Sequence, residues 1–191
     1  MNARWILGLF VGWAMVQVAV PLWQIWKHED VRRTGAAYKL RTAPIDPYDV
    51  LRGRYVALRF ADTEAPVRAG DAIGEHQPAY VRLETDAAGF ARFVELSSKP
   101  PAHGDYLSVR CGALNQASGR MYFELPFDKF FMEETKAPRA ERAFWQHGNR
   151  RDAPPNAYAL VRVKKGRGVI EDLYLENIPI RDFLRQEPTG N

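Results

Sequence analysis

Apolar and polar residues divide the chain into one apolar segment near its start and a longer region of alternating character. From Trp5 to Trp26 no side chain is charged, and Leu, Val, Ala, Ile and Trp dominate. At about 1.5 Å per residue, a helix of this length is roughly 33 Å long, which is enough for one membrane crossing. Trp5 at one end and Trp23 and Trp26 at the other favour the membrane interface. We predict a transmembrane helix over residues 5–26, after a flank of residues 1–4.

A cleaved signal peptide is the alternative interpretation of this segment. The apolar run exceeds the ~7–15 residues of a typical signal peptide, and no small-residue cleavage site follows it. Pro21 also lies where a processing enzyme needs an extended stretch. We therefore expect an uncleaved, single-pass signal anchor in the inner membrane. The short flank with Arg4 favours a periplasmic C-terminal domain, although counting Lys27, Arg32 and Arg33 by the positive-inside rule favours the cytoplasm.

After residue 45, residues alternate between apolar and polar, and Gly, Asn and Asp separate the alternating runs. This pattern predicts a strand at 55–60 and a mostly irregular stretch at 62–76. It also predicts three hairpins: 79–84 with 90–96, 106–111 with 120–125, and 158–163 with 169–175. One soluble helix is expected from about Glu133 to His147, interrupted near Pro138.

These elements predict a mainly β fold of the α+β class. One transmembrane helix is followed by a small antiparallel β-barrel or curled sheet with one soluble helix, because a closed sheet leaves no long exposed edge. We expect residues 27–45 to pass from an amphipathic helical start into a loop and act as a linker. Residues 46–180 then form the domain, and residues 181–191 form a polar tail.

Tyrosine-led strands recur about every fifty residues. Glycine turns precede Tyr55 and Tyr106, and a looser copy begins at Tyr158. A second tyrosine-led strand follows each of them, at Tyr80, Tyr122 and Tyr174. Internal duplication explains this spacing, and so does the ordinary recurrence of Tyr, Val, Leu and Arg in half-buried strands. Both explanations predict antiparallel strand pairs.

The two glycine-led strands resemble the motif of the GDYXXLXY protein family. The first reads Gly53-Arg54-Tyr55-Val56-Ala57-Leu58-Arg59-Phe60, and the second begins Gly104-Asp105-Tyr106. The lead-in from Asp46 to Arg52 is also similar to that family, and the resemblance covers about residues 40–180. The family has no established activity. The resemblance implies an envelope protein with an N-terminal membrane span, often encoded beside a multi-pass membrane protein.

The residues of the motif are expected first to have a structural role, in turns and hydrogen bonds. Gly53 and Gly104 permit turns with positive φ, and Asp105 can accept hydrogen bonds from the turn amides. Arg54 cannot accept such bonds, so the first copy is expected to use Asp46 or Asp49 in an ion pair with a nearby arginine.

A candidate binding face follows from the alternation of the two strands. Tyr55 and Arg59 lie on one face of the first strand, and Tyr106 and Arg110 on one face of the second. Such a face can bind an anionic or aromatic ligand or a partner protein. It can equally be a solvated sheet surface on which tyrosine and arginine stack.

A hydrolase is the alternative to a non-enzymatic interaction module. A Ser-Lys reading uses Ser97 or Ser98 with Lys99, but adjacent residues do not face each other along a strand. Ser98, Asp105 and Tyr106 are the remaining catalytic candidates. No arrangement groups nucleophile, base and orienting residue, so we assign no catalytic residue and favour an accessory module for an integral membrane partner.

The composition makes some classes of ligand unexpected for this chain. With 27 basic and 23 acidic side chains, the chain is only mildly basic, and we expect no nucleic acid partner. His28, His76, His103 and His147 lack metal-ligand spacing, so we expect neither a metal nor a cofactor. The single cysteine, Cys111, lies in an alternating strand and is expected to be buried. Gly8 and Gly12 have the spacing of a weak helix-dimer contact.

Overall fold

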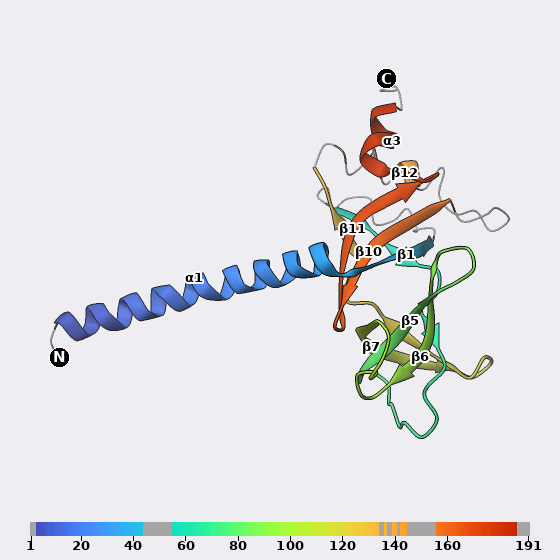
Figure 1. The fold of residues 1–191 in the computed structure, drawn as a ribbon, viewed down its shortest axis with the longest axis horizontal. Coiled ribbons are helices and arrows are strands. Elements are labelled where there is room, and N and C mark those ends of the chain that lie inside the picture. Colours follow the sequence, from blue (N-terminus) through green and yellow to red (C-terminus); the bar gives the residue numbers. More distant parts are fainter. Residues whose placement is uncertain are drawn as a thin grey trace.

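The structure is a computed structural model that describes residues 3–43, 55–133, 136, 139–140, 142–144 and 156–186. It consists of one long helix that projects from a mostly antiparallel β body (Figure 1). Gly53, Asp46 and Asp49, named above as structural motif residues, lie outside the described residues, as does His147.

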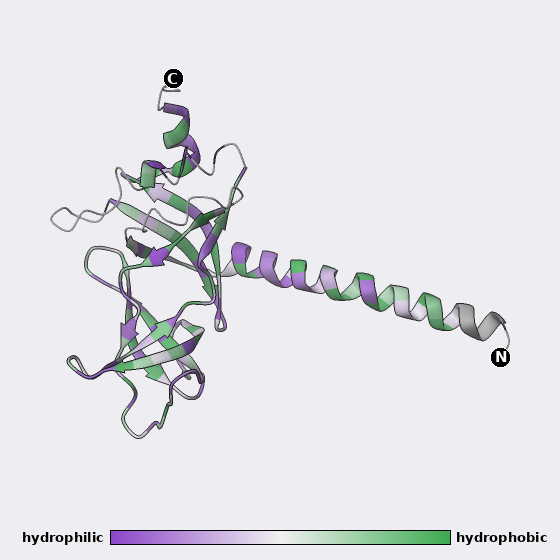
Figure 2. Cartoon of the chain, turned by 180° about the vertical axis from the view of Figure 1, so that it is seen from behind, coloured by the Kyte–Doolittle hydropathy of each residue, from purple (hydrophilic) through white to green (hydrophobic). Residues whose placement is uncertain are grey.

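Helix α1, Ala3–Thr34, is long and apolar enough to cross a membrane. In the described residues its large apolar side chains are exposed on all sides, and Figure 2 shows the hydrophilic residues concentrated at the end next to the β body. Such exposure is unfavourable in water, since it leaves these side chains without an apolar environment. As a helix at the N-terminus, α1 is compatible with a signal anchor or with a signal sequence.

Helix α1 is followed directly by the first strand of a five-stranded sheet. Its strand order is β12-β11-β10-β1-β3. The strands are β1 (Ala36–Ala43), β3 (Arg59–Phe60), β10 (Ala157–Lys164), β11 (Arg167–Leu175) and β12 (Ile178–Pro179). Strand β1 pairs antiparallel with β10, from Ala36 opposite Val163 to Arg41 opposite Tyr158. Helix α3, Ile180–Gln186, follows β12 and buries Ile180 and Leu184.

A second five-stranded sheet, in the order β4-β8-β7-β5-β6, curls into a nearly closed barrel. Its strands are β4 (Glu64–Ala65), β5 (Pro78–Thr85), β6 (Ala91–Ser97), β7 (Tyr106–Asn115) and β8 (Arg120–Glu124). Its two edges meet where Arg68 N donates to Leu96 O and Leu96 N donates to Pro66 O, both at 2.8 Å. The barrel interior holds the alternate apolar residues of these strands, including Val81, Leu107 and Phe123.

The turn of the β10–β11 hairpin joins the two sheets. Ser108 N donates to Gly166 O at 2.8 Å, and Gly166 N donates to Tyr106 O at 3.1 Å. A separate two-stranded sheet pairs β2 (Tyr55–Ala57) with β9 (Lys129–Phe131). One hydrophobic core runs through all of these parts, so the β body is a single packed unit.

The three predicted hairpins are confirmed as β5–β6, β7–β8 and β10–β11. The predicted strand at 55–60 is divided into β2 and β3 at Leu58, whose N–H donates to Asp128 O at 2.8 Å. The alternation is also confirmed, because Val56, Leu58, Leu107 and Val109 are buried. Cys111 is buried as expected, and burial raises the pKa of its thiol.

Three expectations about secondary structure are corrected, and two others are met in part. The loop expected after α1 is instead strand β1, and the start of the expected polar tail is helix α3. The stretch 62–76 is mostly irregular, as expected, and also contains the two-residue strand β4. The Tyr55 strand pairs with β9 rather than with the strand of Tyr80, so the first tyrosine copy does not form the unit seen in the others. The expected soluble helix is helical at residues 139–140 and 142–144 within the described part.

Gly104 has a φ of +83°, in the left-handed region that the sequence predicted for it. A β-branched residue strongly disfavours this region. We expect Gly104→Val to lower the free energy of unfolding by about 1 kcal/mol or more. Denaturation of the detergent-solubilised full chain measures this change. Gly74→Val, in an exposed loop without positive φ, is the matched control. Equal stability of the two variants would contradict the prediction.

Candidate functional site

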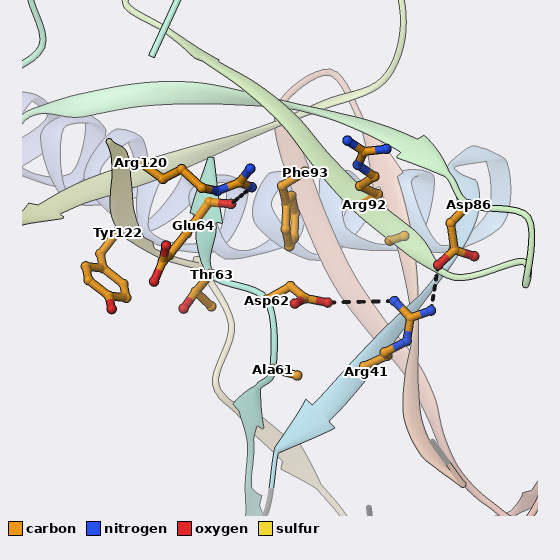
Figure 3. A pocket seen from close by; sticks show the side chains of 11 residues that line it. Arg41, Ala61, Asp62, Thr63, Glu64, Asp86, Arg92, Phe93, Arg120 and Tyr122 are labelled. Carbon is orange, nitrogen blue, oxygen red and sulfur yellow. Dashed lines mark hydrogen bonds and ion pairs between the residues drawn. The ribbon is translucent and has the colours of Figure 1, made fainter. Parts of the chain in front are cut away.

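A polar cleft of about 510 Å³ lies between the barrel and the sheet that contains β1 (Figure 3). We call it the junction cleft. Strand β1, the β3–β4 connection, β6 and β8 all contribute to it. Its lining residues are Arg41, Ala61, Asp62, Thr63, Glu64, Asp86, Ala91, Arg92, Phe93, Arg120 and Tyr122.

Arg41 organises one end of the junction cleft. In Figure 3 its guanidinium lies between two carboxylates, with Asp86 Oδ2 at 2.5 Å and Asp62 Oδ2 at 3.7 Å. The same guanidinium lies over the ring of Phe90, 4.4 Å from its centroid. Arg41 comes from β1, whereas Asp86 and Phe90 flank the β5–β6 turn. The ion pair therefore connects the two sheets directly.

Asp86 is held by its own turn as well as by Arg41. Its Oδ1 accepts hydrogen bonds from the backbone N–H groups of Ala88 and Phe90, each at 2.9 Å. The Arg41 guanidinium, followed by these amides, lowers the pKa of the Asp86 carboxyl. Asp86 is therefore an ionised structural carboxylate at neutral pH.

Glu64 organises the other end of the junction cleft. Its carboxylate accepts hydrogen bonds from Asn115 Nδ2 at 3.2 Å and Ser118 Oγ at 3.3 Å, and Arg120 donates to its backbone carbonyl at 2.7 Å. The Tyr122 hydroxyl, the first of several hydrogen-bonding groups, lowers the pKa of Glu64. The pKa of Tyr122 is raised in turn, chiefly by its hydrogen bond to Glu64.

The junction cleft is lined by charged side chains of both signs. Three arginines face three carboxylates, so the cleft offers both donors and acceptors to a polar ligand. Among the lining arginines, Arg41 forms ion pairs and Arg120 donates to the Glu64 carbonyl, whereas Arg92 has no ion pair or side-chain hydrogen bond among the described residues. The lining contains no Ser, Cys, His or Lys, and two of its carboxylates, Asp86 and Glu64, have lowered pKa values that disfavour a general acid.

The start of the second glycine-led strand, which belongs to the barrel, is hydrogen-bonded to the other five-stranded sheet. Tyr38 Oη, from β1, donates to Asp105 Oδ2 at 2.9 Å. Burial, and then the hydrogen bond to Asp105, raise the pKa of Tyr38 to about 12. The main chain of Asp105 accepts from Leu83 N at 2.9 Å, and the ring of Tyr106 packs edge-on against Tyr80, with centroids 5.7 Å apart.

Comparison with known families agrees with this geometry. The chain matches the family described as GDYXXLXY protein over residues 17–173. The chain belongs to the GDYXXLXY family. No curated protein and no solved structure matches it. In this GDYXXLXY protein the residues Gly104, Asp105 and Tyr106 of the second glycine-led strand have a structural role. They connect the barrel to β1 and to the β10–β11 turn.

The role expected for Asp105 in the GDYXXLXY motif is corrected in one respect. We expected its carboxylate to accept hydrogen bonds from the amides of its own turn. Its described side-chain hydrogen bond instead comes from Tyr38, in the neighbouring sheet. This difference arises because residues 36–43, predicted as a loop, form strand β1. Strand β1 brings the Tyr38 hydroxyl to the start of β7.

The four candidate binding residues of this GDYXXLXY protein do not form one cluster on neighbouring strands. Tyr55 lies in the β2–β9 sheet, where its ring contacts Phe131 with centroids 5.8 Å apart. Arg59 lies on β3 and is exposed, whereas Tyr106 and Arg110 lie on β7 of the barrel. Their contribution to binding remains a prediction, but Tyr55, Arg59 and the Tyr106/Arg110 pair lie in three different sheets.

The residues considered for a hydrolase are engaged elsewhere. Ser97 Oγ donates to the carbonyl of Lys99 at 2.8 Å, and Ser98 Oγ donates to Asp71 Oδ2 at 3.1 Å. Neither serine has a described hydrogen bond to Asp105 or Tyr106. Within the described residues, no three His, Cys, Asp or Glu side chains lie close enough to hold a metal ion.

The junction cleft was not predicted from the sequence. Arg41, Asp62 and Glu64 lie in segments read as a linker or loop, and Arg92 is one charged residue of an alternating strand. A local signal exists only for Asp86, since the Asp86-Ala87-Ala88-Gly89 run predicts a turn. Nothing in the local pattern indicates that these residues converge.

The lowered pKa of Asp86 makes the junction acid-sensitive. A carboxyl whose pKa is lower in the folded state stabilises the protein fully above its unfolded pKa of about 4, and this contribution is lost as pH falls through the folded value. We expect Asp86→Asn to be less stable than wild type at neutral pH and to lose less stability between about pH 5 and 3. Chemical denaturation across this range measures the difference.

Glu75→Gln is the control for this experiment. Glu75 is exposed and has no hydrogen bond or ion pair in the described part of the chain. Its variant should follow the wild-type pH profile. A parallel profile for Asp86→Asn and wild type would show that the Arg41–Asp86 ion pair contributes no pH-dependent stability.

Proposed function

We propose that this GDYXXLXY protein is a non-enzymatic accessory module, anchored in the inner membrane by α1, whose β domain binds an integral membrane partner. The observation that carries the proposal is the direct connection between an exposed apolar helix and the central part of a sheet. Gly35 is the single residue between α1 and β1. A module that only had to be localised would need no such fixed connection, because a flexible linker would be sufficient.

The end of α1 is fixed to the β10–β11 hairpin by several contacts. Val31 is buried, and Lys164 Nζ contacts Asp30 Oδ2 and Thr34 Oγ1, each at 2.7 Å. Gly35 N also donates to Val31 O at 2.9 Å. A Cβ at Gly35 would lie 2.5 Å from Val31 O and 3.0 Å from Val163 O, so only glycine fits at this position. The domain therefore has a defined orientation relative to the helix.

The junction cleft is the surface that we assign to the partner. It presents Arg92, which has no ion pair or side-chain hydrogen bond among the described residues, together with a ring of hydrogen-bonding groups, the combination that orients a polar segment of another protein. A partner anchored in the same membrane needs only moderate affinity for the cleft, since sharing the membrane raises its effective concentration. The hydrolase alternative gains no support from the hydrogen bonds of Ser98, Asp105 or Tyr106.

The proposal includes export of the domain, so that α1 acts as an uncleaved signal anchor and the β body is periplasmic. An alkaline phosphatase fused after Asn191 should be active in intact cells, because this enzyme folds only after export to an oxidising compartment. A reporter that is active only in the cytoplasm, fused at the same position, is the matched control. Activity of the cytoplasmic reporter alone would overturn the assigned topology.

Partner binding is tested by affinity purification of the full chain from gently solubilised membranes. Arg92→Glu reverses the charge of an exposed residue without breaking an ion pair of the described structure, and we expect it to reduce recovery of a multi-pass partner at least about tenfold, as loss of a central interface contact does. Its stability should stay within about 0.5 kcal/mol of wild type.

Arg59→Ala combined with Arg110→Ala is the comparison variant. Both arginines are exposed, and they probe the strand face that the sequence singled out. Full partner recovery by this variant and loss by Arg92→Glu assigns binding to the cleft. The reverse result assigns it to the strands that carry Arg59 and Arg110. Hydrolytic turnover by a pure, monodisperse chain without a partner would contradict the proposal.

A further inference from the structure

A group of basic side chains lies where α1 leaves the predicted membrane span. Lys27 is the first residue after the span of residues 5–26, and its ammonium lies 3.0 Å from the ring centroid of Trp23. The turn of the β10–β11 hairpin brings Lys165 and Arg167 to the same region. Both are exposed. We call Lys27, Lys165 and Arg167 the juxtamembrane cluster.

The position of strand β11 explains why Arg167 belongs to this cluster. Val169 and the α1 residues Gln24, Ile25 and His28 line a common cleft of about 370 Å³. Residues two apart in a strand share a face, so Arg167 is on the side of β11 that faces α1. Desolvation, and then the positive charge of Arg167, lower the pKa of Lys27. Two cations from different elements therefore share one surface.

The acidic groups nearby do not neutralise the cluster, because they are paired with other cations. Asp30 contacts Lys164 at 2.7 Å, Glu29 contacts Arg32 at 2.9 Å and also Arg33, and Glu171 contacts Arg162 at 2.6 Å. Within the described residues, Lys27, Lys165 and Arg167 have no ion pair. Fixed cations without a counter-charge repel one another, and a bound anion removes this repulsion.

The level of the cluster relative to the membrane indicates which anion it meets. Trp23 and Trp26 mark the interface, and Lys27 follows Trp26 by one residue, or about 1.5 Å along the helix. The headgroup layer on each side of a bilayer is about 5–8 Å thick. With the span ending at Trp26, the first helix turn from Lys27 onward and Arg167 beside it lie at the level of the lipid phosphates.

We propose that the juxtamembrane cluster binds the phosphate groups of anionic phospholipids and seats the β10–β11 turn in the headgroup layer. This inference rests on the membrane anchorage stated under the proposed function. Because the same turn hydrogen-bonds to Tyr106 O and Ser108 N in the barrel, lipid binding at the turn fixes the orientation of the whole domain on the membrane surface.

The test uses the full chain in nanodiscs made from an equimolar mixture of phosphatidylglycerol and phosphatidylcholine. Native mass spectrometry of the released protein counts the retained lipids of each kind. We expect wild type to retain phosphatidylglycerol preferentially. The triple variant Lys27→Gln, Lys165→Gln, Arg167→Gln should lose this preference by at least about fivefold, the contribution of one basic residue at headgroup level.

The matched control removes three positive charges elsewhere, through Lys99→Gln, Lys129→Gln and Arg181→Gln. All three residues are exposed, and this variant should keep the wild-type preference. Equal loss in both variants means that net charge alone attracts the lipid, which overturns the proposal. An unchanged preference for phosphatidylglycerol in the triple variant of the cluster also overturns the proposal. The proposal is overturned as well if this variant loses an acidic protein partner but retains the lipid.

Carbonate extraction of the same variants tests membrane anchorage by α1 separately from lipid binding by the cluster. If every variant stays in the membrane and only the cluster variant loses lipid preference, both the anchorage and the lipid site are supported. If wild type is itself extracted by carbonate, the anchorage fails. If wild type stays in the membrane but shows no preference for phosphatidylglycerol, the lipid site alone fails.

Discussion

The pairing of β1 with β10 is the contact on which the rest of the structure depends. It places the first strand of the chain in the interior of a sheet, between β10 and β3. Because β1 follows α1 after Gly35 alone, the same pairing positions the end of the helix against the β10–β11 hairpin. Tyr38 and Arg41, which connect this sheet to the barrel through Asp105 and Asp86, also lie on β1. Without β1 in place, the helix contacts, the inter-sheet hydrogen bonds and one wall of the junction cleft would all be missing.

The role of the second glycine-led strand, Gly104-Asp105-Tyr106, follows from these connections. Gly104 supplies the turn, Asp105 accepts the Tyr38 hydrogen bond, and Tyr106 packs on Tyr80 while its carbonyl accepts from Gly166. Each of the three residues thus contributes to the join between the barrel and the other sheet. In this protein a short motif of ordinary strand residues marks a structural joint, and the polar cleft beside it is a consequence of that joint.

The parts of the fold that the sequence predicted are those determined by local pattern. The hairpins were recognisable because strands such as 158–163 and 169–175 alternate clearly around a turn with glycines. Strand β1 was missed because Ala36-Ala37-Tyr38-Lys39-Leu40-Arg41 contains only one large aliphatic residue, and its burial comes from its neighbours in the sheet. The junction cleft depends on residues 41, 64, 86 and 92, which are brought together only by tertiary structure. For the same reason the pairs Tyr55/Arg59 and Tyr106/Arg110, which look equivalent in sequence, are distributed over three sheets.

The position of β1 also has a consequence for the order of folding. Thr42 Oγ1 donates to Ala157 O, 115 residues later in the chain. The hairpins of the barrel pair strands that are close in sequence, and such local contacts form quickly, whereas contacts of large sequence separation form late. As the chain emerges from the ribosome, α1 and β1 appear first, yet β1 cannot pair with β10 until nearly the whole chain has followed. The strand that couples the domain to its anchor is therefore the last to find its place, and until then its edges are open to other strands.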